Sequence, residues 1–299
     1  MSFVARMPYE WMLRTRSIAL GHKTRVMGIV NVTPDSFSDG GEHATTERAV
    51  AHALQLLDDG ADIVDIGGES TRPGSAAATA EAISAAEEQD RVLPVIAGIL
   101  KARADALISV DTYCAETARA AVQAGAEIVN DVSGGLWDAE MFATWAALHC
   151  GVVVMHTRGL PSAWATQAPL AKESVMQVVL EGLQERVQAA AVAGIPRDRI
   201  VADPGFGFGK RGTENWGMLA KFASFQELDL PLMAGLSRKG FLASGLTATD
   251  ADATQTRDAL THAADLAAIL GGAHLLRVHD VRGAVQSASV ADAVLNANG

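Results

Sequence analysis

The stretch ISVDTYCAETARAAVQAGAEIVND, residues 108–131, decides the fold. A short β-branched run at 108–110 is followed by an Ala-rich amphipathic run and then by a second β-branched run at 128–129. Gly125 stands just past the predicted helix, where a left-handed residue commonly ends a helix. The stretch therefore predicts two parallel strands joined by a helix.

The same alternation recurs along the chain and predicts eight strands. They are expected at 26–30, 63–66, 108–110, 128–129, 152–155, 200–202, 231–234 and 275–278. Helices with apolar residues at three- and four-residue spacing are expected at 47–59, 80–101, 115–124, 172–193 and 257–270. Eight strands, each followed by a helix, close most simply into a (β/α)8 TIM barrel, although an open doubly wound sheet has the same local pattern.

Length and composition indicate one domain. The chain has 299 residues, 49% of them hydrophobic and 20% charged, which suits one barrel at residues 25–299 after an N-terminal extension, residues 1–24. The extension is expected to pack across the barrel bottom or to lie free. Arg6, Glu10 and Arg14 interrupt any signal core, and no apolar run reaches the roughly 20 residues of a membrane helix. We therefore expect a cytoplasmic protein with no membrane partner.

Charge and cysteine content argue against a nucleic-acid-binding protein, a disulfide-rich protein and a zinc protein. The net charge is −11 and Lys and Arg form no run, which argues against a nucleic-acid partner. Cys114 and Cys150 are too few and too far apart for a disulfide framework or an ordinary zinc site.

Polar residues at every strand end favour the barrel over the open sheet. In an open sheet, ligands concentrate at one switch point, whereas all eight strand ends of a barrel meet at one mouth. The residues are Asn31, Glu69, Arg72, Asp111, Asn130, Asp131, His156, Asp203, Ser237 to Lys239 and His279, with Arg277 inside the last strand.

One set at these ends, Asp111, Asn130, Asp203 and Lys239, suits a flat heterocycle. Taken singly, an Asp after a strand is more often a helix cap or a turn residue. Together, two carboxylates can accept from N–H groups while the amide and the ammonium satisfy a carbonyl and a ring nitrogen. A pterin fits this pattern, and a purine fits nearly as well.

A second set, Asn31, Arg72, Arg277 and His279, indicates an anion site, because Arg favours bidentate phosphate contact. The alternative is a pair of solvated or ion-paired surface arginines. Loops 31–41 and 67–74 are rich in Gly, Pro, Ser and Asp, and they carry Phe37 and Arg72. Such loops could fold over a phosphate as lids, or they could be simple connections.

These segments together resemble the pterin-binding enzyme family and, within it, the dihydropteroate synthases. The matching stretches run in order over nearly the whole chain: MGIVNVTPDSFSDGG (27–41), DIGGESTRPG (65–74), NDVS (130–133), DPGFGFGK (203–210), SRK (237–239) and RVHDV (277–281).

The resemblance implies a transferase of folate biosynthesis, of the class that sulfonamides target. It would join 6-hydroxymethyl-7,8-dihydropterin pyrophosphate to p-aminobenzoate, with Mg2+ bridging near Asn31, and would form a homodimer through its outer helices. The implied pterin residues are Asp111, Asn130, Met155, Asp203 and Lys239; those for pyrophosphate are Asn31, Thr71, Arg72, Arg277 and His279; those for p-aminobenzoate are Phe37, Thr71, Pro73, Phe208 and Ser237.

In the implied mechanism, pyrophosphate leaves with assistance from Arg72 and Mg2+, and Asp111 and Asp203 stabilise the pterin cation, with Lys239 beside them. Two positions depart from the family pattern: Gly240 stands where Ser is common, and Arg158 could add a cation near the mouth.

Two alternatives remain. A pterin-binding methyltransferase barrel would keep the Asp and Asn set but has no use for Arg72 and His279. A noncatalytic pterin-binding module could keep the same fold and pocket, because a fold does not fix function.

Overall fold

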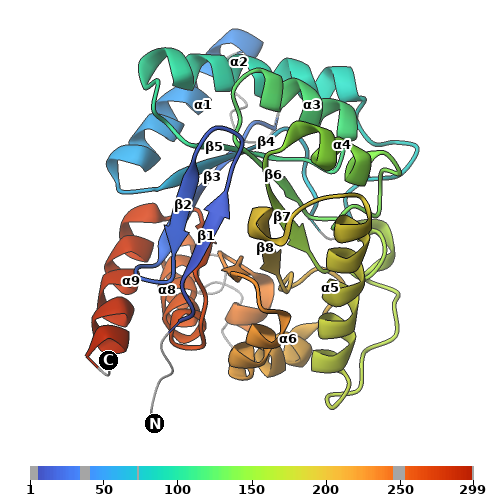
Figure 1. The fold of residues 1–299 in the computed structure, drawn as a ribbon, viewed down its shortest axis with the longest axis vertical. Helices are drawn as coiled ribbons and strands as arrows, with labels where there is room; N and C mark the ends of the chain where they lie inside the picture. Colours follow the sequence, from blue (N-terminus) through green and yellow to red (C-terminus); the bar gives the residue numbers. More distant parts are fainter. Residues whose placement is uncertain (1–5, 34–40, 73, 245–252, 298–299) are drawn as a thin grey trace.

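The chain forms a barrel of parallel strands with helices around it (Figure 1). The computed structural model describes residues 6–33, 41–72, 74–244 and 253–297. The predicted (β/α)8 barrel is confirmed, and the open sheet is excluded. Within the described ranges, no helix combines the length and the apolar character needed to cross a membrane.

The eight predicted strands are all present. Neighbours pair in parallel in the order β8-β7-β6-β5-β4-β3-β10-β9. The barrel closes between its two ends, because the Ala202 amide donates to the Pro231 carbonyl at 2.9 Å. The strands are β3 (Arg25–Asn31), β4 (Ile63–Gly67), β5 (Ile108–Asp111), β6 (Ile128–Asp131), β7 (Gly151–Met155), β8 (Ile200–Asp203), β9 (Met233–Ala234) and β10 (Leu275–Val278).

Helices are found at all five expected ranges, and three more follow β6, β8 and β10. They are α1 (Gly41–Asp58), α2 (Ala85–Ala102), α3 (Ala115–Gln123), α4 (Met141–Leu148), α5 (Val175–Val192), α6 (Gly212–Ala220), α8 (Thr254–Leu270) and α9 (Val281–Asn296). Helix α2 begins later than the predicted residue 80. The Ser84 hydroxyl accepts a hydrogen bond from the Glu87 amide at 3.2 Å and caps the helix there, so the preceding residues belong to the loop.

Alternation along each strand divides the barrel interior into two layers. Side chains of a strand point to opposite faces in turn, so every second residue enters the barrel. Near the strand starts these residues are apolar and form one cluster, which includes Met27, Ile63, Ile128, Val201 and Leu275. Two positions further along, β4, β6, β8 and β10 carry Asp65, Asn130, Asp203 and Arg277. The mouth is therefore polar and the opposite end apolar.

A hairpin covers the apolar end. Strands β1 (Tyr9–Met12) and β2 (Ser17–Leu20) pair antiparallel, and Trp11 and Leu13 join the interior cluster. The hairpin crosses the barrel in Figure 1. Of the two expectations for the N-terminal extension, packing across the bottom is therefore found for its described residues.

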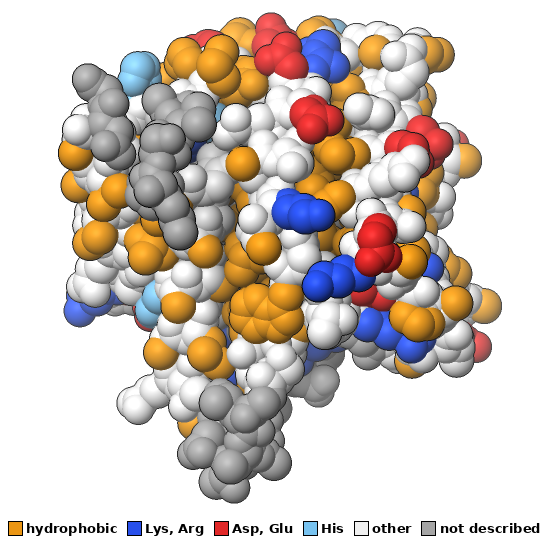
Figure 2. Space-filling model, turned by 90° about the horizontal axis from the view of Figure 1, so that it is seen from below, with side chains coloured by type: hydrophobic (Ala, Val, Ile, Leu, Met, Phe, Trp, Pro, Cys, Tyr) orange, Lys and Arg blue, Asp and Glu red, His pale blue; other side chains and the backbone are white. Residues whose placement is uncertain are grey.

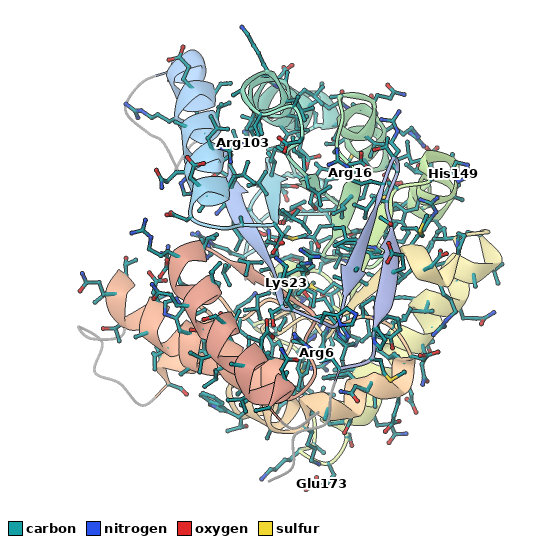
Figure 3. The ribbon with its side chains drawn as sticks, turned by 60° about the vertical axis from the view of Figure 1, so that its left-hand side comes forward. Arg6, Arg16, Lys23, Arg103, His149 and Glu173 are labelled. Carbon is teal, nitrogen blue, oxygen red and sulfur yellow. The ribbon has the colours of Figure 1, made fainter. Side chains whose placement is uncertain are left out.

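Arg6, labelled in Figure 3, anchors the chain ahead of the hairpin. Its guanidinium donates to Asp292 Oδ1 on α9 at 2.6 Å and to Thr24 Oγ1 at 2.6 Å, and its side chain is almost fully buried. The beginning and the end of the described chain are thus tied together at the bottom of the barrel.

Candidate active site

Arg277 links two carboxylates at the mouth. Its Nε donates to Asp65 Oδ2 at 2.6 Å, and its Nη2 donates to Asp111 Oδ2 at 2.5 Å. Asn130 Nδ2 donates to the same Asp65 oxygen at 2.9 Å. Side chains from β10, β4, β5 and β6 therefore form one hydrogen-bonded network, and Asp65 and Asn130 are fully buried within it.

Burial changes the pKa of Asp111 in this network. It raises the pKa of Asp111 to about 7, although the Arg277 charge opposes the rise; the neighbouring Asp65 charge adds to it. Burial therefore disfavours the ionised Asp111 carboxylate, and the Arg277 charge favours it. A ligand that donates an N–H to this carboxyl would favour the ionised form.

Asp203 and Lys239 lie near each other beside the network. Asp203 Oδ1 accepts from the Gly205 amide at 2.7 Å, and burial raises the pKa of this carboxyl against the opposing charge of Lys239. Burial also lowers the pKa of Lys239 to about 8, opposed by Asp203. The Lys239 ammonium lies 4.1 Å from the centre of the Phe208 ring, within cation–π range.

Met155 packs against this corner. It is buried at the end of β7 and is aligned with Asp203 on β8. Gly205 has a φ of +68°, and a Cβ there would lie 3.0 Å from Met155 Cγ and 2.1 Å from the His156 carbonyl oxygen. Only glycine permits this close approach, which holds the loop after β8 against β7.

The predicted anion residues lie at the ends of β3 and β10 and in the loop after β4. Asn31 ends β3 and is aligned with Gly67. Arg72 is exposed and Thr71 is half-buried. The Arg72 charge is the smallest of the influences that lower the pKa of His279. Arg277, expected here, instead belongs to the network with Asp65 and Asp111 and so connects the two sets.

The surroundings of His279 favour its neutral form. Burial, followed by the charges of Arg238 and Arg277, lowers its pKa to about 3. Ser237 Oγ accepts from the His279 amide at 3.1 Å and lies 2.8 Å from its Nδ1. If the hydroxyl donates to Nδ1, the ring proton is on Nε2, so His279 would offer an N–H donor rather than a charge.

Phe208 is the one aromatic residue predicted for the p-aminobenzoate region that lies within the described part of the chain. Its ring contacts Trp164 edge to face at 5.2 Å and lies under the Lys239 ammonium. Phe37 and Pro73, also predicted there, fall outside the described residues.

Two of the polar residues expected at the mouth, Asp131 and His156, turn away from it. Asp131 accepts from the Ser133 and Gly135 amides and shapes a turn. Asp131 and His156 each follow an inward residue by one position, so alternation turns them outward. Glu69 accepts a hydrogen bond from the Tyr113 hydroxyl.

Sequence reasoning overlooked two residues that organise the site. Asp65 joins Arg277 to Asn130, and its signal in the sequence is a carboxylate inside the strand expected at 63–66. Lys210 is buried and donates to His156 Nδ1 at 2.9 Å and to the His156 and Pro204 carbonyls, both at 3.0 Å. Its only signal was a lone Lys after the glycine-rich stretch.

The structure describes the contacts of Arg158 and Gly240, the two positions that depart from the family pattern. Arg158 donates to the Gly209 carbonyl at 3.0 Å and to the Ala168 carbonyl at 3.2 Å, so it braces loops. Gly240 is exposed at the start of the 3-10 helix Gly240–Ala243, and a Cβ there would meet nothing within 4 Å.

Comparisons with known proteins agree with this geometry. The family model described as pterin binding enzyme matches residues 27–279. A curated dihydropteroate synthase of Streptococcus pyogenes is 44% identical over 257 residues, covering 86% of this chain and 90% of that protein.

Two solved structures of the Xanthomonas albilineans dihydropteroate synthase are also similar. The one with 4-aminobenzoic acid is 44% identical with a TM-score of 0.83, covering 95% of this chain and 98% of that one. The one with 7,8-dihydropteroate is 42% identical with a TM-score of 0.78, covering 92% and 95%. The chain therefore belongs to the pterin-binding enzyme family and, within it, to the dihydropteroate synthases, which are transferases of folate synthesis.

Proposed function

We propose that this protein condenses 6-hydroxymethyl-7,8-dihydropterin pyrophosphate with p-aminobenzoate, forming 7,8-dihydropteroate and releasing pyrophosphate. The observation that carries the proposal is the buried network in which Arg277 joins Asp65 and Asp111 next to Asn130. The relatives solved with 4-aminobenzoic acid and with 7,8-dihydropteroate support the same substrate and product.

The pterin would bind between the network and the Asp203–Lys239 pair. Asp111 and Asp203 are the acceptors for ring N–H groups, Asn130 offers a donor and an acceptor, and Lys239 donates to a carbonyl or ring nitrogen. Met155 would pack against the ring. Because burial disfavours both bare carboxylates, a ligand that supplies N–H donors gains more here than it would in water.

The pyrophosphate would bind at the rim, near Asn31, Thr71, Arg72 and His279. Arg72 would supply a positive charge, and His279, whose Nδ1 lies beside the Ser237 hydroxyl, would supply an Nε2–H donor. Arg277 donates through Nε and Nη2 to its two carboxylates, so its remaining Nη1 would face the leaving group.

The residues at the rim fit a Mg2+ ion bound together with the pyrophosphate. Mg2+ prefers oxygen ligands and often keeps waters while it binds substrate phosphates. The Asn31 side-chain carbonyl would be one such ligand; among the described residues, no cluster of three or more His, Cys, Asp or Glu could hold a metal alone. When bound, Mg2+ would neutralise part of the leaving-group charge.

Breaking the carbon–oxygen bond to pyrophosphate leaves a pterin methylene cation. Asp111 and Asp203 would stabilise that cation, while Arg72 and His279 hold the departing pyrophosphate. The neutral aromatic amine of p-aminobenzoate then attacks the methylene carbon and afterwards loses a proton, so no strong base is required. Thr71, Phe208 and Ser237, with Phe37 and Pro73, would shape the aminobenzoate site, and closure of the two loops would exclude water.

The experiment is a pyrophosphate-release assay with the pterin pyrophosphate and Mg2+, with and without p-aminobenzoate. We expect release that depends on p-aminobenzoate, with dihydropteroate as product, and a loss of about 100-fold or more in Arg72→Ala. Arg103→Ala is the matched control: Arg103 pairs with Asp58 at 2.5 Å on the outer surface, and it should leave the rate unchanged.

Pterin binding without release would contradict the proposal and leave a noncatalytic pterin-binding module. Transfer of a methyl group from a folate, again without pyrophosphate release, would indicate a methyltransferase barrel instead.

We further infer a homodimer formed through outer helices. Val192 at the end of α5, Trp216 on α6 and Val290 on α9 are exposed apolar residues. Apolar side chains are spread over the face seen from below, where α6 lies (Figure 2). Light scattering after size exclusion tests this inference: a mass near 31.2 kDa, that of one chain, would contradict it.

A further inference from the structure

The Tyr113 hydroxyl joins two points of the loop that follows β4. It donates to Glu69 Oε2 at 2.5 Å and accepts from the Ala78 amide at 2.8 Å. Glu69 lies just before Thr71 and Arg72, and Ala78 lies beyond them. Burial, then the hydrogen bond to Glu69, raises the pKa of Tyr113, so the hydroxyl keeps its proton and remains a donor.

Tyr113 is itself held firmly. It follows the pterin-side residue Asp111 by two positions, and its ring contacts Trp137 edge to face at 5.2 Å. Residue 113 therefore connects the strand end that carries Asp111 to the loop that carries Arg72.

An open pocket of about 390 Å³ lies beside the loop at this point, lined in part by Glu69, Thr79, Tyr113 and Trp137. Ala78 has a φ of +57°, a left-handed conformation that a non-glycine residue rarely adopts without support. The hydrogen bond from its amide to Tyr113 supplies such support.

We propose that Tyr113 is a positioning residue, whose hydroxyl holds Glu69 and Ala78 so that Thr71 and Arg72 face the rim of the active site. Tyr113 acts through Arg72 and does not contact substrate. The inference rests on the proposed function, because Arg72 matters only if pyrophosphate binds at the rim.

The test is Tyr113→Phe, which removes the hydroxyl and keeps the ring. Losing two hydrogen bonds should lower kcat/KM for dihydropteroate formation about tenfold. Binding of the unphosphorylated hydroxymethylpterin should change less than about twofold, because no pterin residue moves. Amide exchange at Ala78 should become faster.

A double-mutant cycle with Arg72→Ala separates positioning from a general structural effect. Tyr113→Phe should reduce kcat/KM by less than about twofold when Arg72 is already absent. The matched control is Tyr9→Phe, which removes a tyrosine hydroxyl bonded to Asp229 at the opposite end of the barrel and should not change kcat/KM. Thermal unfolding of each variant verifies that it folds.

The outcomes of these assays separate a failure of the proposed function from a failure of the inference about Tyr113. Wild-type protein that makes no dihydropteroate overturns the proposed function and this inference with it. Active wild type with an equally active Tyr113→Phe overturns this inference alone. Full additivity with Arg72→Ala also overturns it, because Tyr113 would then act by another route.

Discussion

The two layers of the barrel interior differ in polarity although they lie two residues apart on the same strands. Ile63 and Leu275 belong to the apolar layer under the hairpin, while Asp65 and Arg277 form the ion pair at the mouth. Burying a large apolar side chain contributes about 1.5–3 kcal/mol, whereas burying a charge is unfavourable unless it is paired. The comparison indicates that the apolar layer stabilises the fold. The polar layer lowers the free energy of unfolding because it holds buried charges for a ligand.

The largest effect is expected from Arg277→Met. It leaves Asp65 and Asp111 without their shared cation, which should lower the free energy of unfolding by about 3–5 kcal/mol. The same change should lower kcat/KM for dihydropteroate formation by about 100-fold or more. Denaturant unfolding and steady-state kinetics measure the two effects.

Arg6→Met is the matched control at the bottom of the barrel, because Arg6 is also buried and paired with an aspartate, Asp292. It should be destabilising yet leave kcat/KM of the folded protein within about twofold of the wild type. A loss of activity as large as that of Arg277→Met would show that the two layers are not separate.

Trp11→Ala should produce the next largest effect, on stability alone. Trp11 is fully buried under the barrel and donates to the Arg199 carbonyl at 2.9 Å. Truncation should lower the free energy of unfolding by about 3–5 kcal/mol. The KM values should stay unchanged at temperatures where the variant is folded; a change above about threefold would contradict the division between layers.

The apolar layer and the strands around it could be predicted from sequence because alternation is a local signal. Residues 128–131 already show a buried run and a polar tip, and all eight strands were located this way. Whether Asp131 or Asn130 faces the mouth also follows from the two-residue period, but only once the strand's register in the barrel is known.

The hairpin β1–β2 and the role of Asp65 could not be predicted in the same way. The hairpin is short, and its apolar residues acquire a purpose only against the barrel bottom, which is distant in sequence. Asp65 pairs with Arg277, more than two hundred residues away, and a long-range pair leaves no local pattern. The role of Lys210 could not be predicted for the same reason, since its partner His156 belongs to another loop.

Glu88→Gln tests whether charge burial near the mouth lowers stability. Glu88 on α2 accepts from Thr112 Oγ1 at 3.0 Å, and burial raises its pKa from 4.5 to about 7. The folded-state pKa is raised, so the stability that Glu88 contributes is present below pH 4.5 and is lost as the pH rises through about 7. Glutamine keeps the acceptor and removes the charge, so it should stabilise the protein on the order of 2 kcal/mol at pH 8.

The pH dependence makes that prediction specific. The gain in the free energy of unfolding from Glu88→Gln should decrease as the pH falls from 7 to 5, because the wild-type carboxyl is protonated in the folded state below about pH 7. Glu87→Gln, at a half-exposed neighbour in the same helix, is the matched control and should change stability by less than about 0.5 kcal/mol at either pH. A gain from Glu88→Gln that is equal at both pH values would contradict the explanation by burial.

The smallest effect is expected from Gly240→Ser at the rim. A Cβ at Gly240 enters open space, so the free energy of unfolding should change by less than about 0.5 kcal/mol. The added hydroxyl would supply a donor beside Lys239 for the aminobenzoate carboxylate, so the KM for p-aminobenzoate should fall about threefold. Gly217→Ser on α6 also enters open space and should leave this KM unchanged. If Gly240→Ser leaves it unchanged too, the aminobenzoate carboxylate does not bind near residue 240, and Phe208 and Ser237 become the residues to vary next.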